Sequence, residues 1–139
     1  RQKQKHSNNM TILTSLLFSI LAFGPFGTPV QADLTTPNAV AETRCGWFVN
    51  PTPANAWLID ADREWIISTQ GGEHADGDWP EFKDSQWVKT NVNYGHGCAC
   101  MKVETNRSDE RITRIISAYA KPLSACRKDK ALKGKEPGR

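Results

Sequence analysis

The chain has 139 residues, with 18 Lys and Arg side chains against 15 Asp and Glu and a formal net charge of +3. A chain of this length holds one domain, which excludes a large multidomain enzyme. The small basic excess also argues against a nucleic-acid-binding protein, which normally carries a dominant basic field.

Residues 1–32 have the pattern of a secretory signal peptide. Basic residues at Arg1, Lys3 and Lys5 precede an apolar run over 12–23, and the tripeptide 30–32 places small side chains at the positions before a cleavage site. A membrane anchor would need about 20 apolar residues, so cleavage after Ala32 is preferred. A start at Met10 would remove the basic leader and weaken the signal. The pattern predicts a periplasmic or secreted protein with no stable membrane anchor.

After cleavage, 15 basic and 15 acidic residues remain, so the exported chain is neutral. Acidic residues dominate up to Asp84 and basic residues dominate after it. We expect the two halves to form ion pairs across the fold.

The exported part reads as short strands joined by turns. Residues 33–43 are polar and predict a flexible arm. Apolar and β-branched runs at 44–49, 56–60 and 64–69, separated by Pro-, Asn- and Asp-rich turns, predict an antiparallel meander. Residues 98–105 predict a fourth strand.

The segment 112–120 fits two structures. Ile112, Ile115, Ile116 and Tyr119 have helical spacing, but the β-branched composition and the turn before it favour a strand. We predict a strand there, a short helix within 122–132 and a disordered tail over 133–139. The expected fold is mainly β, a small antiparallel meander or partly open barrel of about five strands, with one stapled domain over 44–132.

Four cysteines lie after the predicted signal: Cys45, Cys98, Cys100 and Cys126. In an exported chain they are expected to form two disulfides. Cys98 and Cys100 share one side of a strand, so each should take a distant partner. A turn near 106–109 would return the chain past Cys98, which favours Cys98–Cys126 and Cys45–Cys100. The rival is a metal site with His96, and this spacing matches no closed zinc pattern.

Five tryptophans suggest both a core and a surface. Trp47, Trp57 and Trp65 fall on predicted strands and should fill the core. Trp79 and Trp87 lie at the far end of a long, Gly-rich, acidic loop over 71–87. Long loops with aromatic anchors often bind partners. We therefore predict a working surface made of Trp79, Trp87, Glu73, His74 and Asp78.

The same loop suggests two alternatives. Glu73, His74, Asp76 and Asp78 could hold a divalent cation, but the order of a calcium loop is missing. His74 and His96 with Glu73 could act as an acid–base pair in a small hydrolase or metal-dependent enzyme, although no complete catalytic constellation or serine motif is present. We expect no catalytic residue, no tightly bound metal and no cofactor.

Short strings along the chain resemble a known family. They are Arg44-Cys45-Gly46-Trp47, Gly97-Cys98-Ala99-Cys100 and Pro122-Leu123-Ser124-Ala125-Cys126. They resemble a bacterial family of small exported domains of unknown function over about 43–132. The resemblance implies an exported, disulfide-bonded domain and no activity. The preferred hypothesis is a non-enzymatic binding or inhibitor-type module for an envelope protein or glycan. A structural accessory without a ligand is the remaining alternative.

Overall fold

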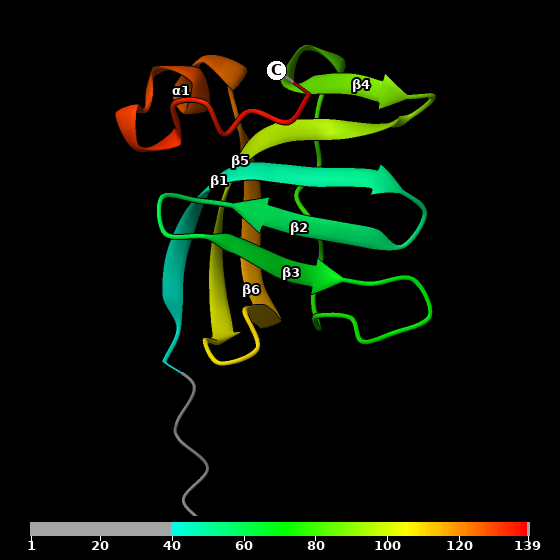
Figure 1. Cartoon of the computed structure of the whole chain (residues 1–139), viewed down its shortest axis with the longest axis vertical. Helices are drawn as coiled ribbons and strands as arrows, with labels where there is room; N and C mark the ends of the chain where they lie inside the picture. The colour runs from blue at the N-terminus through cyan, green and yellow to red at the C-terminus, as the bar shows by residue number, and fades with distance from the viewer. Residues whose placement is uncertain (1–39, 139) are drawn as a thin grey trace, which may run out of the picture. The chain divides into compact units, whose positions relative to one another are not determined.

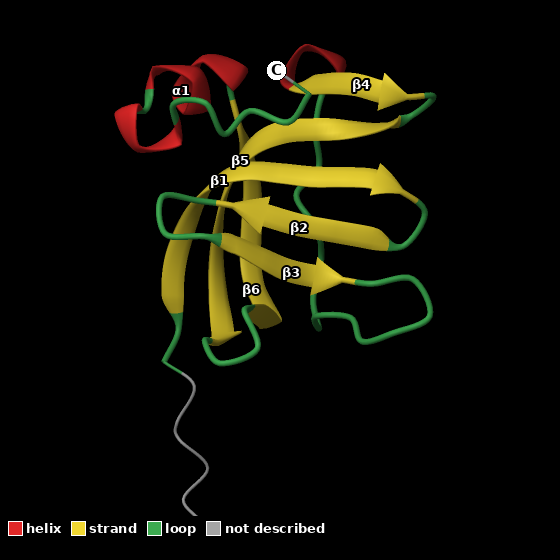
Figure 2. Cartoon of the chain, in the orientation of Figure 1, coloured by secondary structure: helices red, strands yellow, loops and turns green. Residues whose placement is uncertain are grey.

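The computed structural model describes residues 40–138, so the predicted signal peptide and most of the predicted arm lie outside the described residues. Figures 1 and 2 show a mainly β domain with short helical segments at one end. In chain order the elements are β1 (Glu42–Thr52), β2 (Asn55–Ile59), β3 (Glu64–Ser68), η1 (Asp84–Gln86), β4 (Trp87–Asn91), β5 (Tyr94–Asn106), β6 (Arg111–Lys121), α1 (Leu123–Lys128) and η2 (Lys130–Leu132).

The first three strands form the expected antiparallel meander, and polar side chains build its turns. Between β1 and β2 the Asn50 amide donates to the carbonyls of Thr52 and Asn55 at 2.9 and 2.5 Å. Between β2 and β3, Asp60 Oδ1 accepts the backbone amides of Asp62 and Arg63 at 2.8 and 2.9 Å. Such side-chain bonds replace the strand ladder where the chain reverses.

Strand β5 links all the long strands into a partly closed ring. It pairs antiparallel with β1 on one edge and with β6 and β4 on the other. The ring closes through a single parallel bridge, Ile66 with Arg111, so it is not a true barrel. The sheet order is β1-β2-β3-β6-β5-β4 (Figure 1).

The predicted fold class is confirmed, with differences in detail. The segment 112–120 is a strand, as its β-branched composition indicated. Two features were not predicted: a sixth strand, β4, and the start of β5 at Tyr94 rather than at Cys98. Both lie in a stretch rich in Asn and Gly, whose sequence carries little alternation of apolar residues.

The sheet buries apolar side chains on both faces. The larger cluster lies inside the ring and is built around Trp65, Leu58, Met101 and Phe48. The smaller cluster lies on the opposite face, where Trp47 and Val49 pack with Leu132 and both cysteines of one disulfide. Trp47 and Trp65 are therefore core residues as predicted, whereas Trp57 is only half-buried against the smaller cluster.

Two disulfides staple this arrangement, with the predicted connectivity. Cys45–Cys100 joins β1 to β5, and Cys98–Cys126 joins β5 to α1. No free cysteine occurs among the described residues. The second bridge holds α1 over the smaller cluster.

The segment after η2, expected to be a disordered tail, contacts the domain. Lys135 Nζ donates to the carbonyls of Asp60 and Ala61 at 2.8 and 2.9 Å. Glu136 accepts from the Arg127 guanidinium at 2.8 Å. Figure 1 shows this segment running from the helical segments towards the start of β4. None of the helices between residues 40 and 138 is long and apolar enough to cross a membrane.

Candidate binding groove

The loop after β3 folds back onto the larger core cluster through three aromatic rings. Trp79, Phe82 and Trp87 pack around Phe48, with ring centroids 5.6, 5.7 and 6.4 Å from it. Phe82 and Trp87 are 4.9 Å apart. All three rings are half-buried, so each keeps an exposed part. They anchor the loop and also form part of its surface.

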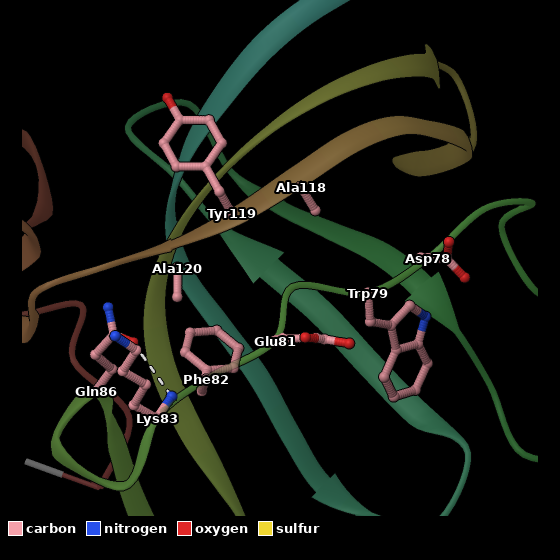
Figure 3. A pocket seen from close by; sticks show the side chains of 9 residues that line it. All are labelled: Asp78, Trp79, Glu81, Phe82, Lys83, Gln86, Ala118, Tyr119 and Ala120. Atoms are coloured by element: carbon pink, nitrogen blue, oxygen red, sulfur yellow. Dashed lines mark hydrogen bonds between the residues drawn. The ribbon is translucent and has the colours of Figure 1, made fainter.

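Strand β6 and this loop enclose a groove of about 790 Å³, which we call the β6 groove. One wall is the end of β6, and the other is the loop before η1 (Figure 3). Figure 3 shows Tyr119 pointing away from the loop, while Ala120 points towards Phe82. The lining residues are Asp78, Trp79, Glu81, Phe82, Lys83, Gln86, Ala118, Tyr119 and Ala120.

A second hollow of about 370 Å³ adjoins the first. Trp79 and Phe82 line both hollows and form the ridge between them, and Trp87 lines only the second. The indole N–H of Trp87 donates to the Asn93 carbonyl at 3.1 Å. Trp87 is therefore tied to the β4–β5 turn.

The β6 groove is mildly acidic. The exposed carboxylates of Asp78 and Glu81 outnumber the single ammonium of Lys83. The Lys83 amide donates to the Gln86 side chain at 3.2 Å, which stabilises the turn at the end of the groove. The groove thus combines aromatic surface, two carboxylates and the edge of a strand.

The remaining residues of the predicted surface lie elsewhere. Glu73, His74 and Asp76 line a separate hollow of about 540 Å³. There Arg111 Nε lies 3.3 Å from a Glu73 carboxylate oxygen. The structure therefore divides the five predicted residues into two sets: Asp78 and Trp79 at the β6 groove with Trp87 next to it, and Glu73 with His74 apart.

His74 contacts a buried serine, but the pair is not arranged for nucleophilic catalysis. His74 Nδ1 lies 2.5 Å from Ser68 Oγ, and Ser68 Oγ donates to the Ala54 carbonyl at 2.6 Å. Because the only hydroxyl hydrogen goes to Ala54, His74 Nδ1 must carry the hydrogen that it shares with Ser68. A general base would need the opposite arrangement.

His96 lies in different surroundings. Its side chain is 2% exposed, packs edge-on against Trp47 at 5.4 Å, and places Nε2 3.5 Å from Glu136. No hollow described above contains both His74 and His96. Within residues 40–138 no three His, Cys, Asp or Glu side chains are placed to hold a metal ion.

At the opposite end of the ring, a group of charged residues surrounds Trp65; we call it the Trp65 cluster. The guanidinium carbons of Arg44, Arg63 and Arg107 lie 4.5, 5.2 and 5.8 Å from the centre of the Trp65 ring. The Trp65 indole N–H and Arg44 both donate to Asp60 Oδ2 at 2.9 Å.

Arg44 is the hub of that cluster and also bonds Asp62 and Glu42, at 2.6 and 2.8 Å. Burial acts to raise the pKa of Glu42, but hydrogen bonds from Arg44 and Thr105 outweigh it, and the pKa lies below the ordinary value. Burial acts to lower the pKa of Arg44, yet its bonds to Glu42, Asp62 and Asp60 raise it. The cluster is a structural network of ion pairs centred on Arg44.

Sequence reasoning missed the β6 wall of the groove. Phe82, Ala118, Tyr119 and Ala120 were not among the predicted binding residues. A usable signal was present: two small residues alternate with an exposed aromatic near the end of a predicted strand. What could not be read from the sequence is that this edge of the strand faces the loop over 71–87.

These features define a class, a small disulfide-stapled β domain with an open groove beside a strand end. The chain belongs to the family described as "Protein of unknown function (DUF4087)", which it matches over residues 39–133. Comparison with curated proteins and with solved structures found no match.

Proposed function

We propose that this protein is an exported, non-enzymatic binding module that holds an envelope protein in the β6 groove. The observation that carries the proposal is the placement of Trp79 and Phe82. Both rings pack on the core beneath and line the two adjoining hollows above. Half-buried aromatic rings held in place by a rigid scaffold are the usual anchors of protein interfaces.

Export is part of the proposal. It rests on the signal pattern over residues 1–32 and on the two disulfides, which persist in oxidising compartments. The separation of His74 from His96, and the hydrogen that His74 shares with Ser68, favour binding over acid–base catalysis.

The test compares two tryptophans of similar burial on opposite faces of the sheet. Trp79 packs on the larger cluster beside the groove, and Trp57 packs on the smaller one away from it. The purified protein and the variants Trp79→Ala and Trp57→Ala would be cross-linked in a bacterial envelope extract. We expect Trp79→Ala to weaken capture of the partner by about 2 kcal/mol, roughly thirtyfold in affinity.

The Trp57→Ala variant should capture the same partner as the unmodified protein. Equal capture by all three proteins would contradict the groove as the binding surface. Equal loss in both variants, together with a lower melting temperature, would show that the tryptophans act only through stability.

A further inference from the structure

Among residues 40–138, the edge of β6 that faces the groove has backbone groups without a partner. The disulfide beside this edge shows which residues carry them. Cys45 and Cys100 lie opposite each other with their Cα atoms 4.0 Å apart. Opposite residues this close form a non-hydrogen-bonded pair of an antiparallel ladder. The N–H and C=O of Cys100 therefore point away from β1 and towards β6.

The alternation of hydrogen-bonded and non-hydrogen-bonded pairs also determines the direction of the backbone groups of β6. Cys100 lies opposite Tyr119, and Cys98 lies opposite Lys121. These pairs exchange both backbone bonds, so the backbone groups of Tyr119 and Lys121 are used within the sheet. The N–H and C=O groups of Ala118 and Ala120 consequently point to the other edge, into the β6 groove that both residues line.

Earlier along β6, at Thr113 and Ile115, the same edge is paired with the loop. Asp76 N–H donates to the Thr113 carbonyl at 3.1 Å, and Ile115 N–H donates to the Asp76 carbonyl at 2.7 Å. The chain then leaves the edge at Gly77, which has a φ of +98° and passes so close that a Cβ would lie 2.1 Å from the Ile115 carbonyl oxygen. Beyond this point no backbone bond from the loop to Ala118 or Ala120 is formed.

We propose that the β6 groove binds an extended segment of a partner polypeptide, which adds to the edge of β6 as a further strand. The proposal rests on the proposed function and specifies its binding mode. Ala118 and Ala120 offer donors and acceptors at the two-residue spacing of a strand, as in other β-strand additions. Successive side chains of such a strand point to opposite faces, so every second side chain meets the aromatic wall of Trp79 and Phe82.

The groove also indicates the chemistry of the segment. Apolar side chains fit against the half-buried rings of Trp79 and Phe82. A Lys or Arg in the segment complements the carboxylates of Asp78 and Glu81. Side chains on the other face of the added strand lie beside Tyr119, which is 51% exposed. The expected segment therefore alternates apolar residues and carries at least one basic residue.

The test uses a displayed library of random linear twelve-residue peptides, selected on the purified protein. The key variant is Ala120→Pro, which removes an edge N–H that none of residues 40–138 accepts. Its matched control is Ala120→Val, which is similar in size and keeps the N–H. We expect selected peptides to bind Ala120→Pro at least tenfold more weakly than Ala120→Val, because the two variants place a similar volume in the groove and differ in the edge N–H.

Amide hydrogen exchange gives an independent readout. Bound peptide should slow exchange at Ala118 and Ala120, with little change at Tyr119. The proposal is overturned if no peptide is enriched, or if Ala120→Pro binds as well as Ala120→Val while both remain folded.

Two other results separate this proposal from the proposed function. Peptides or soluble peptidoglycan fragments that need Trp79 but ignore Ala120→Pro would keep the groove as a binding site and overturn strand addition. A dimer in analytical ultracentrifugation that Ala120→Pro abolishes would identify a second copy of this chain as the occupant, and would overturn the partner polypeptide.

Discussion

Two regions of this domain use the same residue types for opposite purposes. The Trp65 cluster and the β6 groove each combine tryptophan with charged side chains. Around Trp65 the indole N–H is bonded, the ring is fully buried, and three guanidinium groups lie over it. In the β6 groove Trp79 is half-buried and two carboxylates are exposed, and the strand edge beside it has no backbone partner within the described part of the chain.

The difference shows what separates a structural cluster from a binding surface. In the Trp65 cluster every charged side chain is ion-paired, although the Nε atoms of Arg44 and Arg63 are buried without a hydrogen-bond partner among residues 40–138. A buried network that is paired in this way stabilises the fold and has little left to offer a ligand. An open edge with half-buried aromatic rings has interactions still to make. The number of tryptophans and charged residues does not distinguish the Trp65 cluster from the β6 groove. The fraction of polar groups that already have a partner within the domain does.

The largest expected effect comes from a substitution in the Trp65 cluster. Trp65→Ala should lower the free energy of unfolding by about 3–5 kcal/mol, because it leaves a large cavity in the core. Trp79→Ala should cost roughly 1–2 kcal/mol, because its ring is only partly removed from water. Urea unfolding of both variants measures the contrast, and equal losses would mean that Trp79 is a core residue like Trp65.

Removal of the hub cation should be nearly as costly. Arg44→Met leaves the buried Asp60 carboxylate without its ion-pair partner, and breaking such a pair costs about 3–5 kcal/mol. Arg111→Met is the control, since its partner Glu73 is largely exposed and such a pair contributes about 0–1 kcal/mol. If the two substitutions have the same effect in urea unfolding, the cluster around Trp65 does not stabilise the fold as described.

The disulfide to α1 should act on stability alone. Replacement of Cys98 and Cys126 together by Ala should lower the free energy of unfolding by about 2–4 kcal/mol and loosen α1 over Trp47. The β6 groove lies on the other cluster, so peptide affinity should not change below the unfolding temperature. A large loss of affinity in the folded variant would show that the two faces are coupled.

A smaller effect should appear in acid. The pKa values of Glu42 and Asp62 lie below their ordinary values of 4.5 and 3.8 in the folded protein, so both carboxylates bind protons more weakly folded than unfolded. Their contribution to stability is present above those ordinary values and is lost as the pH falls through the folded pKa values. The melting temperature should be level between about pH 7 and 5 and fall towards pH 3.

Glu42→Gln provides the control for that prediction. The variant should start from a lower melting temperature at neutral pH and show a shallower decrease in acid. An unchanged acid profile would assign the decrease to other carboxylates.

Much of the closed architecture could be predicted from the sequence. The alternation of apolar residues located the meander, and the β-branched composition of 112–120 outweighed its helical spacing. The disulfide pairing followed from the shared face of Cys98 and Cys100 and from the turn before Arg111. Each of these signals lies within one strand, or in two segments that a single turn joins.

The candidate site could be predicted only in part. Trp79 and Asp78 were recognised from loop length and composition, but Ala118 and Ala120 were not. Their role depends on which residues of β6 direct their backbone groups to β5 and which direct them to the other edge. This alternation is set by a bulge near Ile116 and by the pairing with β5. The alternation, and the departure of the loop at Gly77, depend on contacts between residues far apart in the chain.

The most direct measurement is amide hydrogen exchange of the free protein, residue by residue along β6. An open edge predicts fast exchange at Ala118 and Ala120 and slow exchange at Tyr119 and Lys121, whose amides bond to β5. Uniform slow exchange over residues 118–121 would show that the edge is covered, and would contradict the β6 groove as a site for a partner strand.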